Sequence, residues 1–478
     1  MLHLLIACAP TPAPPGTPNV VLVSLDTLRA DRLGAWGNVD GLTPNLDRFA
    51  AEAVTFRRAY SQAVVTAASH ASMFSSRYPT EEQGGRAPVF GDDKPLLAEV
   101  LTIYGYQTGA FVGGADLNPA MNMTRGFATY TSPLDFGSLW STVPPALEWI
   151  DARDTARPFF SFIHGYDAHV HYLKPAPYGF MYADRDYEGP GRDAVDLGSE
   201  RMVHGYLFRD ISAIQDVHGA HLRNYAPEAI ADMKAHALSG DPPALPTGDR
   251  DSAHVRGVYN GAVSYLDTQF GLLMSGLEAR GLLENSVVVV VSDHGEQLGE
   301  YGYFNHSWGT GEEETHVVLM IRPPGPPRPA RVVDEVVELI DVAPTLIDYA
   351  GGTVPAGARG GSLRAAVEND TWKSRGWAFT QGNDRMRSVS VRGPAGRFTY
   401  TGLPASSALL PDLVAAASLD GPGFSAEPSD LDRATRADMR ERLVVWLRSL
   451  AAPPQDPQEA LPSALRDALR ARGYWDAQ

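Results

Sequence analysis

The sequence is poor in cysteine: Cys8 is the only one among 478 residues. This excludes an internal disulfide framework and a metal cluster held by several thiolates. Long apolar runs are also missing, and without a run of about 20 apolar residues no transmembrane helix is expected. Basic residues (40) are fewer than acidic ones (57), which gives a net charge of −17 and argues against a nucleic-acid partner. A small anionic substrate stays compatible, because a metal can reverse the local charge of a cleft.

The composition is that of a large globular protein. Hydrophobic residues make up 44% of the chain, enough for a substantial core. Two runs rich in β-branched and other apolar residues, Val20–Leu25 and Val287–Val291, are typical of strands buried on both faces of a parallel sheet. Asp26 and Asp293 follow these runs. Because open α/β sheets bind ligands beyond the carboxyl ends of their strands, we expect the two carboxylates to meet at one site.

The remaining patterns predict an α/β core followed by a small C-terminal α+β part. The expected strands lie at 108–112, 158–163, 377–380, 388–391 and 397–400, and the expected helices at 43–50, 95–101, 255–277, 336–350, 431–450 and 460–472. We expect three parts. Residues 1–17 form a leader and a Pro-rich tether, residues 18–365 form the main domain, and residues 366–478 form a subdomain. A less regular insertion at 178–252 is expected to cap the site of the main domain.

A cluster of small hydroxyl residues precedes a short helical run between Val65 and Pro79 (VTAASHASMFSSRYP). An oxygen nucleophile at a helix N-terminus lies beside free N–H groups and the positive end of the helix dipole, which favour a developing anion. Ser and Thr residues also simply cap helices, so this segment alone does not establish catalysis.

Several motifs together resemble the sulfatase family of the alkaline phosphatase superfamily. They lie at Val20–Asp26, Thr66–Pro79, Ser292–Glu296, Leu339–Thr345 (LIDVAPT) and Leu469–Tyr474. The resemblance covers nearly the whole chain except the insertion. It implies an alkaline-phosphatase-like three-layer core with a large mixed, mostly parallel sheet, and a small C-terminal α+β subdomain. It also implies an enzyme that hydrolyses esters, with the main domain as the catalytic domain.

The nucleophile position departs from the sulfatase motif, which is Cys/Ser-x-Pro-x-Arg. Sulfatases oxidise the Cys or Ser to formylglycine, whose hydrated aldehyde attacks sulfur, and the methyl-bearing carbon of Thr66 cannot give that aldehyde. Relatives with Thr resemble phosphodiesterases, phosphomutases and phosphoethanolamine-type transferases, in which a metal-bound threonine oxygen attacks. Ala68 and His70 replace the motif's Pro and Arg, and Thr27 follows Asp26 where sulfatases have a second Asp. These departures favour phosphate mono- or diesters, with an arylsulfatase-like sulfuric ester hydrolase or a phospho-group transferase as alternatives.

A metal site is implied by the same resemblance. Its ligands are Asp26, Thr66, Asp293 and His294. Carboxylate and hydroxyl oxygens with one imidazole suit a divalent metal such as Zn²⁺, Mn²⁺, Mg²⁺ or Ca²⁺. For Asp293 and His294, a strand-end turn closed by Asx hydrogen bonds is the structural alternative. The cation would lower the pKa of the Thr66 hydroxyl, and water would then hydrolyse a phospho- or sulfo-threonine intermediate.

Histidines are the candidates for the acid that protonates the leaving oxygen. His169 matches the histidine of an Asp-Pro-His-x-Pro-Tyr segment in bacterial sulfatase-like proteins. His306 falls where sulfatases place a Lys or His on the ester oxygens, and His70 is a candidate for either role. Asp167 and His171 are four residues apart, as in the Asp-x-x-x-His pair that binds a second zinc in nucleotide phosphodiesterase relatives. A surface histidine is the alternative for His171.

The start of the chain resembles the lipobox of bacterial lipoproteins. The motif is Leu5–Cys8 (LIAC), with the cysteine as the lipidated residue, and the Pro-rich stretch 9–18 indicates an extended tether. The apolar segment is short and lacks a basic region, so a chance apolar start is the alternative. The lipobox predicts a lipid anchor in the bacterial cell envelope. The sequence does not indicate the oligomeric state.

A non-catalytic, membrane-tethered binding protein is the alternative from a different functional class. Ala68 and the missing arginine of the motif favour it. Retention of Asp26, Asp293 and His294 favours catalysis, because a protein that had lost turnover would not be expected to keep all three.

Overall fold

The computed structural model describes residues 13–79, 95–134, 136–170, 172, 174–188, 249–300, 304–306, 309–369, 371–382, 388–401, 410–416, 418–419 and 424–451. Cys8, His171, most of the expected insertion and the expected helix at 460–472 lie outside them. The chain forms two compact units. The first comprises Met1–Tyr166, Asp267–Gly295 and Ser307–Gln478, and the second comprises Asp167–Leu266 and Glu296–His306. The boundaries expected at residues 17 and 365 stay predictions.

The first unit is built on a large mixed sheet. Its strands follow the order β11 (Arg331–Glu338), β2 (Val54–Tyr60), β10 (Leu319–Arg322), β6 (Ser286–Val291), β1 (Asn19–Leu25), β5 (Phe159–Gly165), β3 (Gln107–Phe111) and β4 (Thr129–Thr131), with β9 (His316–Val317) paired to β2. The pairings of β1 with β5 and with β6 are both parallel. Among the described strands of this sheet, β10 and β9 pair antiparallel to their neighbours. The strand β1 is therefore central, and its carboxyl end lies between those of two parallel neighbours.

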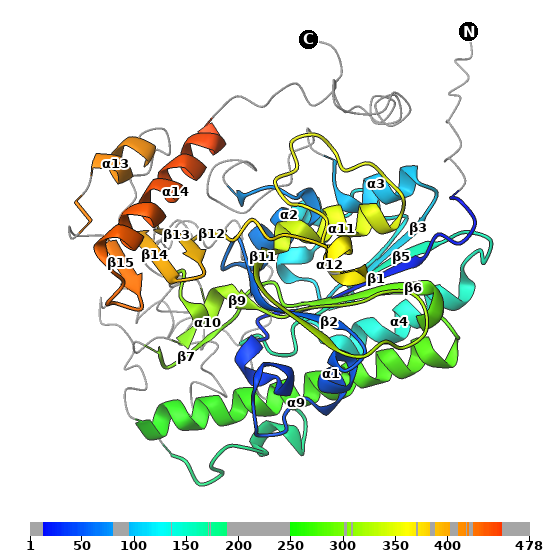
Figure 1. Ribbon diagram of the computed structural model, residues 1–478. Helices are drawn as coiled ribbons and strands as arrows, with labels where there is room; N and C mark the ends of the chain where they lie inside the picture. Colours follow the sequence, from blue (N-terminus) through cyan, green and yellow to red (C-terminus); the bar gives the residue numbers. More distant parts are fainter. Residues whose placement is uncertain are drawn as a thin grey trace. The chain divides into compact units, whose positions relative to one another are not determined.

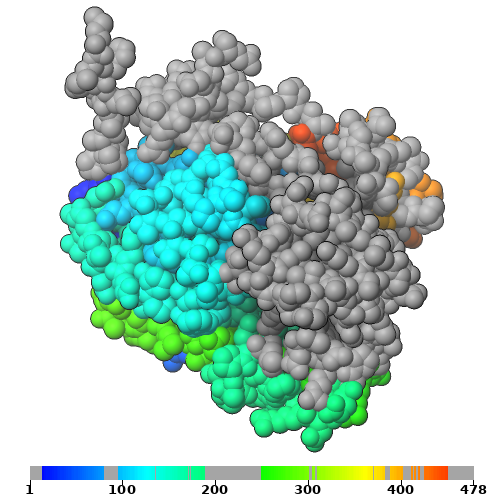
Figure 2. Space-filling model, turned by 180° about the vertical axis from the view of Figure 1, so that it is seen from behind, coloured from blue at the N-terminus to red at the C-terminus, as the bar shows by residue number. Residues whose placement is uncertain are grey.

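Helices cover both faces of this sheet (Figure 1). One face carries α2 (Thr66–Ser75), α3 (Leu97–Ile103), α11 (Val342–Tyr349) and α12 (Arg364–Glu368), and the other carries α1 (Pro44–Ala50), α4 (Leu139–Ala152) and the part of α9 (Asp249–Ala279) that follows Leu266. Val20 and Leu22 of β1 belong to one hydrophobic core together with Phe74 of α2 and Leu346 of α11. Seen from behind, the cyan segment that includes α4 forms a broad area of the surface (Figure 2). The layers match the expected three-layer core.

A smaller antiparallel sheet follows in the C-terminal region. It has the order β12 (Ala378–Gln381), β13 (Ser388–Gly393), β14 (Gly396–Thr401) and β15 (Phe424–Glu427), accompanied by α13 (Leu410–Ala416) and α14 (Arg433–Ala451). The rings of Phe379 and Trp446 stack with centroids 4.9 Å apart, which joins β12 to α14. Three of these strands and the long helix lie where the sequence patterns predicted them.

The helix expected at 336–350 begins later than predicted. Residues up to Glu338 belong to β11, because this strand pairs in parallel with β2 through the register Glu338 with Tyr60. A short 3₁₀ turn, Leu339–Asp341, then leads into α11 at Val342. The spacing of the apolar residues before Glu338 is compatible with both a helix and a strand. Only the pairing with the distant strand β2 selects the extended conformation.

The second unit contains the N-terminal part of α9 and the short strands β7 (Gln297–Leu298) and β8 (Phe304–Asn305), which pair antiparallel. The helix α10 (Glu312–Thr315) belongs to the first unit. Among the described residues, none of the helices has the length and apolar character needed to cross a membrane.

Candidate metal centre and active site

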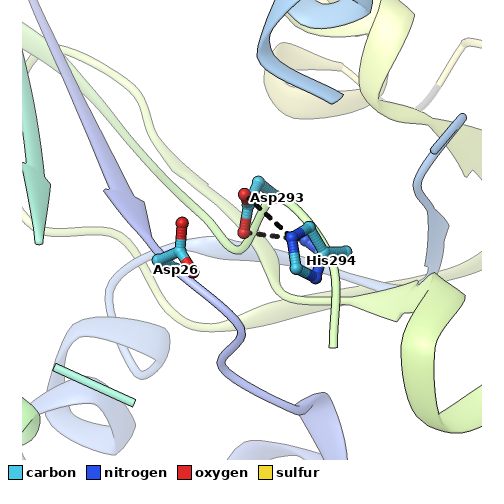
Figure 3. Close-up of side chains that lie close together, drawn as sticks. All are labelled: Asp26, Asp293 and His294. Atoms are coloured by element: carbon cyan, nitrogen blue, oxygen red, sulfur yellow. Dashed lines mark hydrogen bonds and ion pairs between the residues drawn. The ribbon is translucent and has the colours of Figure 1, made fainter. Parts of the chain in front are cut away.

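Two carboxylates meet at the carboxyl ends of β1 and β6. Asp26 follows the last residue of β1, and its backbone N–H donates to Gly165 O at 3.1 Å. Asp293 follows β6 by two residues, and both side chains are fully buried. Because Ser24 pairs with Val291 in parallel register, both chain segments leave the sheet at the same edge. The structure thus brings together the two strand-end acids that the sequence predicts, with His294 beside them (Figure 3).

Asp26, Asp293 and His294 each offer one ligand atom, and these atoms lie within 4.8 Å of one another. Asp293 Oδ1 accepts the backbone N–H groups of Thr27 at 3.2 Å and of His294 at 2.9 Å. Its other oxygen, Oδ2, is buried and accepts no hydrogen bond from the described residues. An ionised carboxylate oxygen in that position needs a compensating charge.

The buried oxygen of Asp293 faces imidazoles. Its Oδ2 lies 3.5 Å from His294 Nε2 and 3.6 Å from His70 Nδ1. Burial would raise the pKa of this carboxyl group, but three neighbouring imidazoles, His294 first among them, outweigh burial and lower the pKa to about 2. Asp293 is therefore ionised at neutral pH, and its Oδ2 accepts no hydrogen bond from the described residues. The donor set of two carboxylates, an imidazole and a hydroxyl fits a divalent cation.

Thr66 supplies the hydroxyl of this set. It is the first residue of α2, and its side chain is almost fully buried. Its Oγ1 donates to Asp26 Oδ2 at 3.1 Å and lies 3.4 Å from His294 Nε2. The four predicted metal ligands therefore form one cluster, at the N-terminus of a helix whose dipole favours anions.

His70 lies behind this cluster. Its ring is fully buried; Nδ1 lies 2.8 Å from the carbonyl oxygen of Thr66, and Nε2 lies 2.9 Å from Ser24 Oγ. Both ring nitrogens have protein partners, which does not favour the predicted contact with an ester. Burial lowers the pKa of His70, although Asp293 opposes the shift.

His164 is part of the site and was missed by sequence reasoning. It lies in β5 beside Ser24 of β1, and its Nε2 is 3.2 Å from Asp26 Oδ2. The signal that could have found it is its place at the end of a buried apolar run, as for the two predicted acids.

The remaining predicted histidines belong to the second unit. His306 Nδ1 lies 3.0 Å from the fully buried Glu296 Oε1, and the rings of His306 and His169 are 5.1 Å apart. Asp167 is fully buried in this unit, and its predicted partner His171 lies outside the described residues. The contacts of these residues with an ester or a second metal stay predictions.

Comparison with known proteins identifies the family of this chain. The family model named Sulfatase matches residues 18–352. The chain belongs to the sulfatase family. An arylsulfatase of Clostridium perfringens is 24% identical over 420 residues, which cover 74% of this chain and 80% of that protein. The multifunctional alkaline phosphatase superfamily protein PehA of Trinickia caryophylli is 25% identical over 411 residues, covering 72% and 76%.

The fold of this sulfatase-family chain is shared with solved structures. The phosphonate monoester hydrolase of Silicibacter pomeroyi aligns with a TM-score of 0.63 and 21% identity, covering 90% of this chain and 95% of that one. The expected family, the fold and the class of ester hydrolases are thereby confirmed. The relatives named here include both a sulfatase and a phosphonate monoester hydrolase, so the family alone leaves the substrate open.

Proposed function

We propose that this sulfatase-family protein is a divalent-metal-dependent hydrolase of phosphorus esters, with Thr66 as its nucleophile. One observation carries the proposal: the Thr66 hydroxyl lies 3.1 Å from Asp26 Oδ2 and 3.4 Å from His294 Nε2 in a buried cluster with Asp293. A threonine that merely capped α2 would direct its oxygen to the helix N–H groups. The N-cap of α2 is Val65, and Thr66 Oγ1 lies against Asp26 and His294 instead.

The chain's own groups define the chemistry. A cation held by Asp26, Asp293, His294 and Thr66 would lower the pKa of the hydroxyl and neutralise the ester oxygens. The proton of Thr66 leaves towards Asp26 Oδ2, the atom to which it is already donated. The freed oxygen attacks phosphorus, the bond to the leaving alcohol breaks, and that alcohol oxygen takes up the proton that Thr66 released, passed on through solvent. Water then attacks phosphorus of the phospho-threonine, the bond between phosphorus and the Thr66 oxygen breaks, and a proton of this water passes to that oxygen.

The residue type at position 66 supports phosphorus over sulfur. Threonine cannot be oxidised to the aldehyde that the sulfatase resemblance links to sulfate esters. Attack by the hydroxyl itself needs no modification of the side chain. The fold shared with a solved phosphonate monoester hydrolase supports testing phosphate mono- and diesters and phosphonate esters as substrates. Because an arylsulfatase is among the relatives, a sulfate ester is tested beside them.

A panel assay tests the proposal. The purified protein is stripped with a chelator and reloaded with Zn²⁺, Mn²⁺, Mg²⁺ or Ca²⁺. Turnover of nitrophenyl phosphate, its diester, a nitrophenyl phosphonate and nitrophenyl sulfate is then measured. We expect metal-dependent turnover of a phosphorus ester, at least 10³-fold lower in Thr66→Ala and partly kept in Thr66→Ser.

Ser72→Ala is the matched control, because Ser72 lies in α2 and its buried hydroxyl makes no hydrogen bond with the described residues. Full turnover in Thr66→Ala would refute the nucleophile. Turnover of the sulfate ester alone would refute the choice of phosphorus.

A lipid anchor at Cys8 is a separate proposal, supported by the lipobox-like Leu5–Cys8. It predicts that radiolabelled palmitate is incorporated by bacterial cells expressing the wild type and lost in Cys8→Ser. Equal labelling of both proteins would contradict the anchor and the envelope location.

A further inference from the structure

The side chain of His70 bridges two elements that carry site residues. Ser24 lies in β1, on the same face as Val20 and Leu22, which is the face that α2 covers. Its Oγ is 2.9 Å from His70 Nε2, and His70 Nδ1 is 2.8 Å from the carbonyl oxygen of Thr66. The bridge thus runs from β1, the strand that Asp26 follows, to the first residue of α2.

The chemistry of the partners fixes where the protons lie. A carbonyl oxygen only accepts, so His70 Nδ1 carries the proton in the bond to Thr66. Nε2 pairs with the Ser24 hydroxyl, which donates to it when the ring carries a single proton.

The surroundings of the ring hold it in this orientation. His70 is fully buried among the rings of Phe74, Phe162 and His164, with centroids 6.5, 5.8 and 5.2 Å away. Water is excluded from both hydrogen bonds, which strengthens them relative to exposed ones. Rotation of the ring would break both bonds and leave buried polar atoms without partners.

We propose that His70 is a positioning residue, which ties the first turn of α2 to β1 and thereby fixes the Thr66 hydroxyl for attack. The inference rests on the proposed function of Thr66. It differs from the sequence-based expectation, in which His70 touches the ester or acts as the acid. It assigns to an imidazole the position at which the family motif has an arginine, and it adds Ser24 as the partner that orients the ring.

Variants of His70 test the bridge. His70→Leu removes both hydrogen bonds, and His70→Asn restores a donor at the place of Nδ1. We expect His70→Leu to lower kcat about 10- to 100-fold, because small misplacement of a reacting group is costly. KM should change less than threefold and the bound metal should be retained. His70→Asn should recover most of kcat. An unchanged kcat in His70→Leu, or no recovery in His70→Asn, would overturn the proposal.

Ser24→Ala tests the outer half of the bridge. Because Ser24 acts only through the ring, the double variant Ser24→Ala/His70→Leu should be no slower than His70→Leu alone. Additive losses would overturn the role of Ser24. The Ser72→Ala variant serves again as the control in α2, with unchanged kcat.

A readout independent of turnover comes from ¹⁵N NMR of the histidine-labelled, metal-loaded wild type, with His70→Asn for assignment. The bridge predicts a protonated Nδ1. An unprotonated Nδ1 would overturn it. Failure of the proposed function is distinguishable: Thr66→Ala would then keep its turnover, whereas failure of this inference leaves Thr66→Ala inactive and His70→Leu active.

Discussion

Substitution of Asp293 by asparagine separates metal binding from the structure of the loop. Asn can keep an oxygen in the place of Oδ1, which accepts the backbone N–H groups of Thr27 and His294. Its amide nitrogen replaces Oδ2, which accepts no hydrogen bond from the described residues. The change is therefore nearly isosteric, and in the metal-free variant we expect the free energy of unfolding to fall only by the attraction between the Asp293 carboxylate and the neighbouring imidazoles.

The effect on the cation is much larger. Loss of a charged ligand should weaken cation binding at least ~100-fold, or about 2.7 kcal/mol. At a cation concentration of 100 times the wild-type Kd, the wild type gains about 2.7 kcal/mol in the free energy of unfolding. The variant, whose Kd then equals that concentration, gains only about 0.4 kcal/mol.

Titration calorimetry and denaturant unfolding, each with and without cation, measure both quantities. Asp267→Asn is the matched control, because Asp267 is also buried and accepts the backbone N–H groups of Asn45 and Leu46. This variant should keep the full stabilisation by the cation. Equal stabilisation of wild type and Asp293→Asn would refute the ligand set.

Three further predictions concern other parts of the molecule. Burial raises the pKa of Glu338 to about 7, although Arg375 opposes the shift; the stability from its protonated form is present below about pH 4.5 and is lost as pH rises to about 7. In the wild type, the free energy of unfolding measured with denaturant should therefore fall by roughly 1–3 kcal/mol over this pH window, and in Glu338→Gln it should not. The same pH dependence of stability in both proteins would contradict this prediction. A Cβ at Gly295 would overlap the backbone carbonyl oxygen of Glu313. Gly295→Ala should therefore displace the adjacent His294 and weaken cation binding at least ~10-fold, as measured by titration calorimetry. An unchanged Kd for the cation would contradict this prediction. His306→Gln should lower kcat by about 10²-fold or more if His306 is the acid, and an unaltered pH–rate profile would remove it from that role.

The ends of buried strands were predictable because their sequence signal is local. A run rich in β-branched residues, followed at once by Asp26 or by Ser292 and then Asp293, identified β1 and β6. The rule for parallel sheets placed the two acids at one edge. The motif at Thr66 predicted the start of α2. These signals depend on nearest neighbours along the chain and on one general rule of topology, so they needed no knowledge of the register.

The rest of the site depends on pairings between distant strands. The apolar run before His164 marks a strand end, but His164 faces Asp26 because β5 pairs with β1 in a particular register. Nothing near His164 in the sequence specifies that register. The bridge from Ser24 to His70 likewise needs the packing of α2 on β1. The start of α11 was predicted too early because the residues up to Glu338 pair with β2 as a strand of the sheet. This pairing between distant segments overrides the local periodicity.

The proposed reaction requires covalent attachment of the substrate's phosphoryl group to Thr66. It is tested most directly by acid quenching of the metal-loaded protein during turnover of a phosphorus ester, followed by mass spectrometry of the peptide that contains this residue. We predict a phosphoryl group on Thr66 in the wild type and in Ser72→Ala, and none in Thr66→Ala. Steady turnover by the wild type with an unmodified Thr66, or with the group on a different residue, would contradict the account.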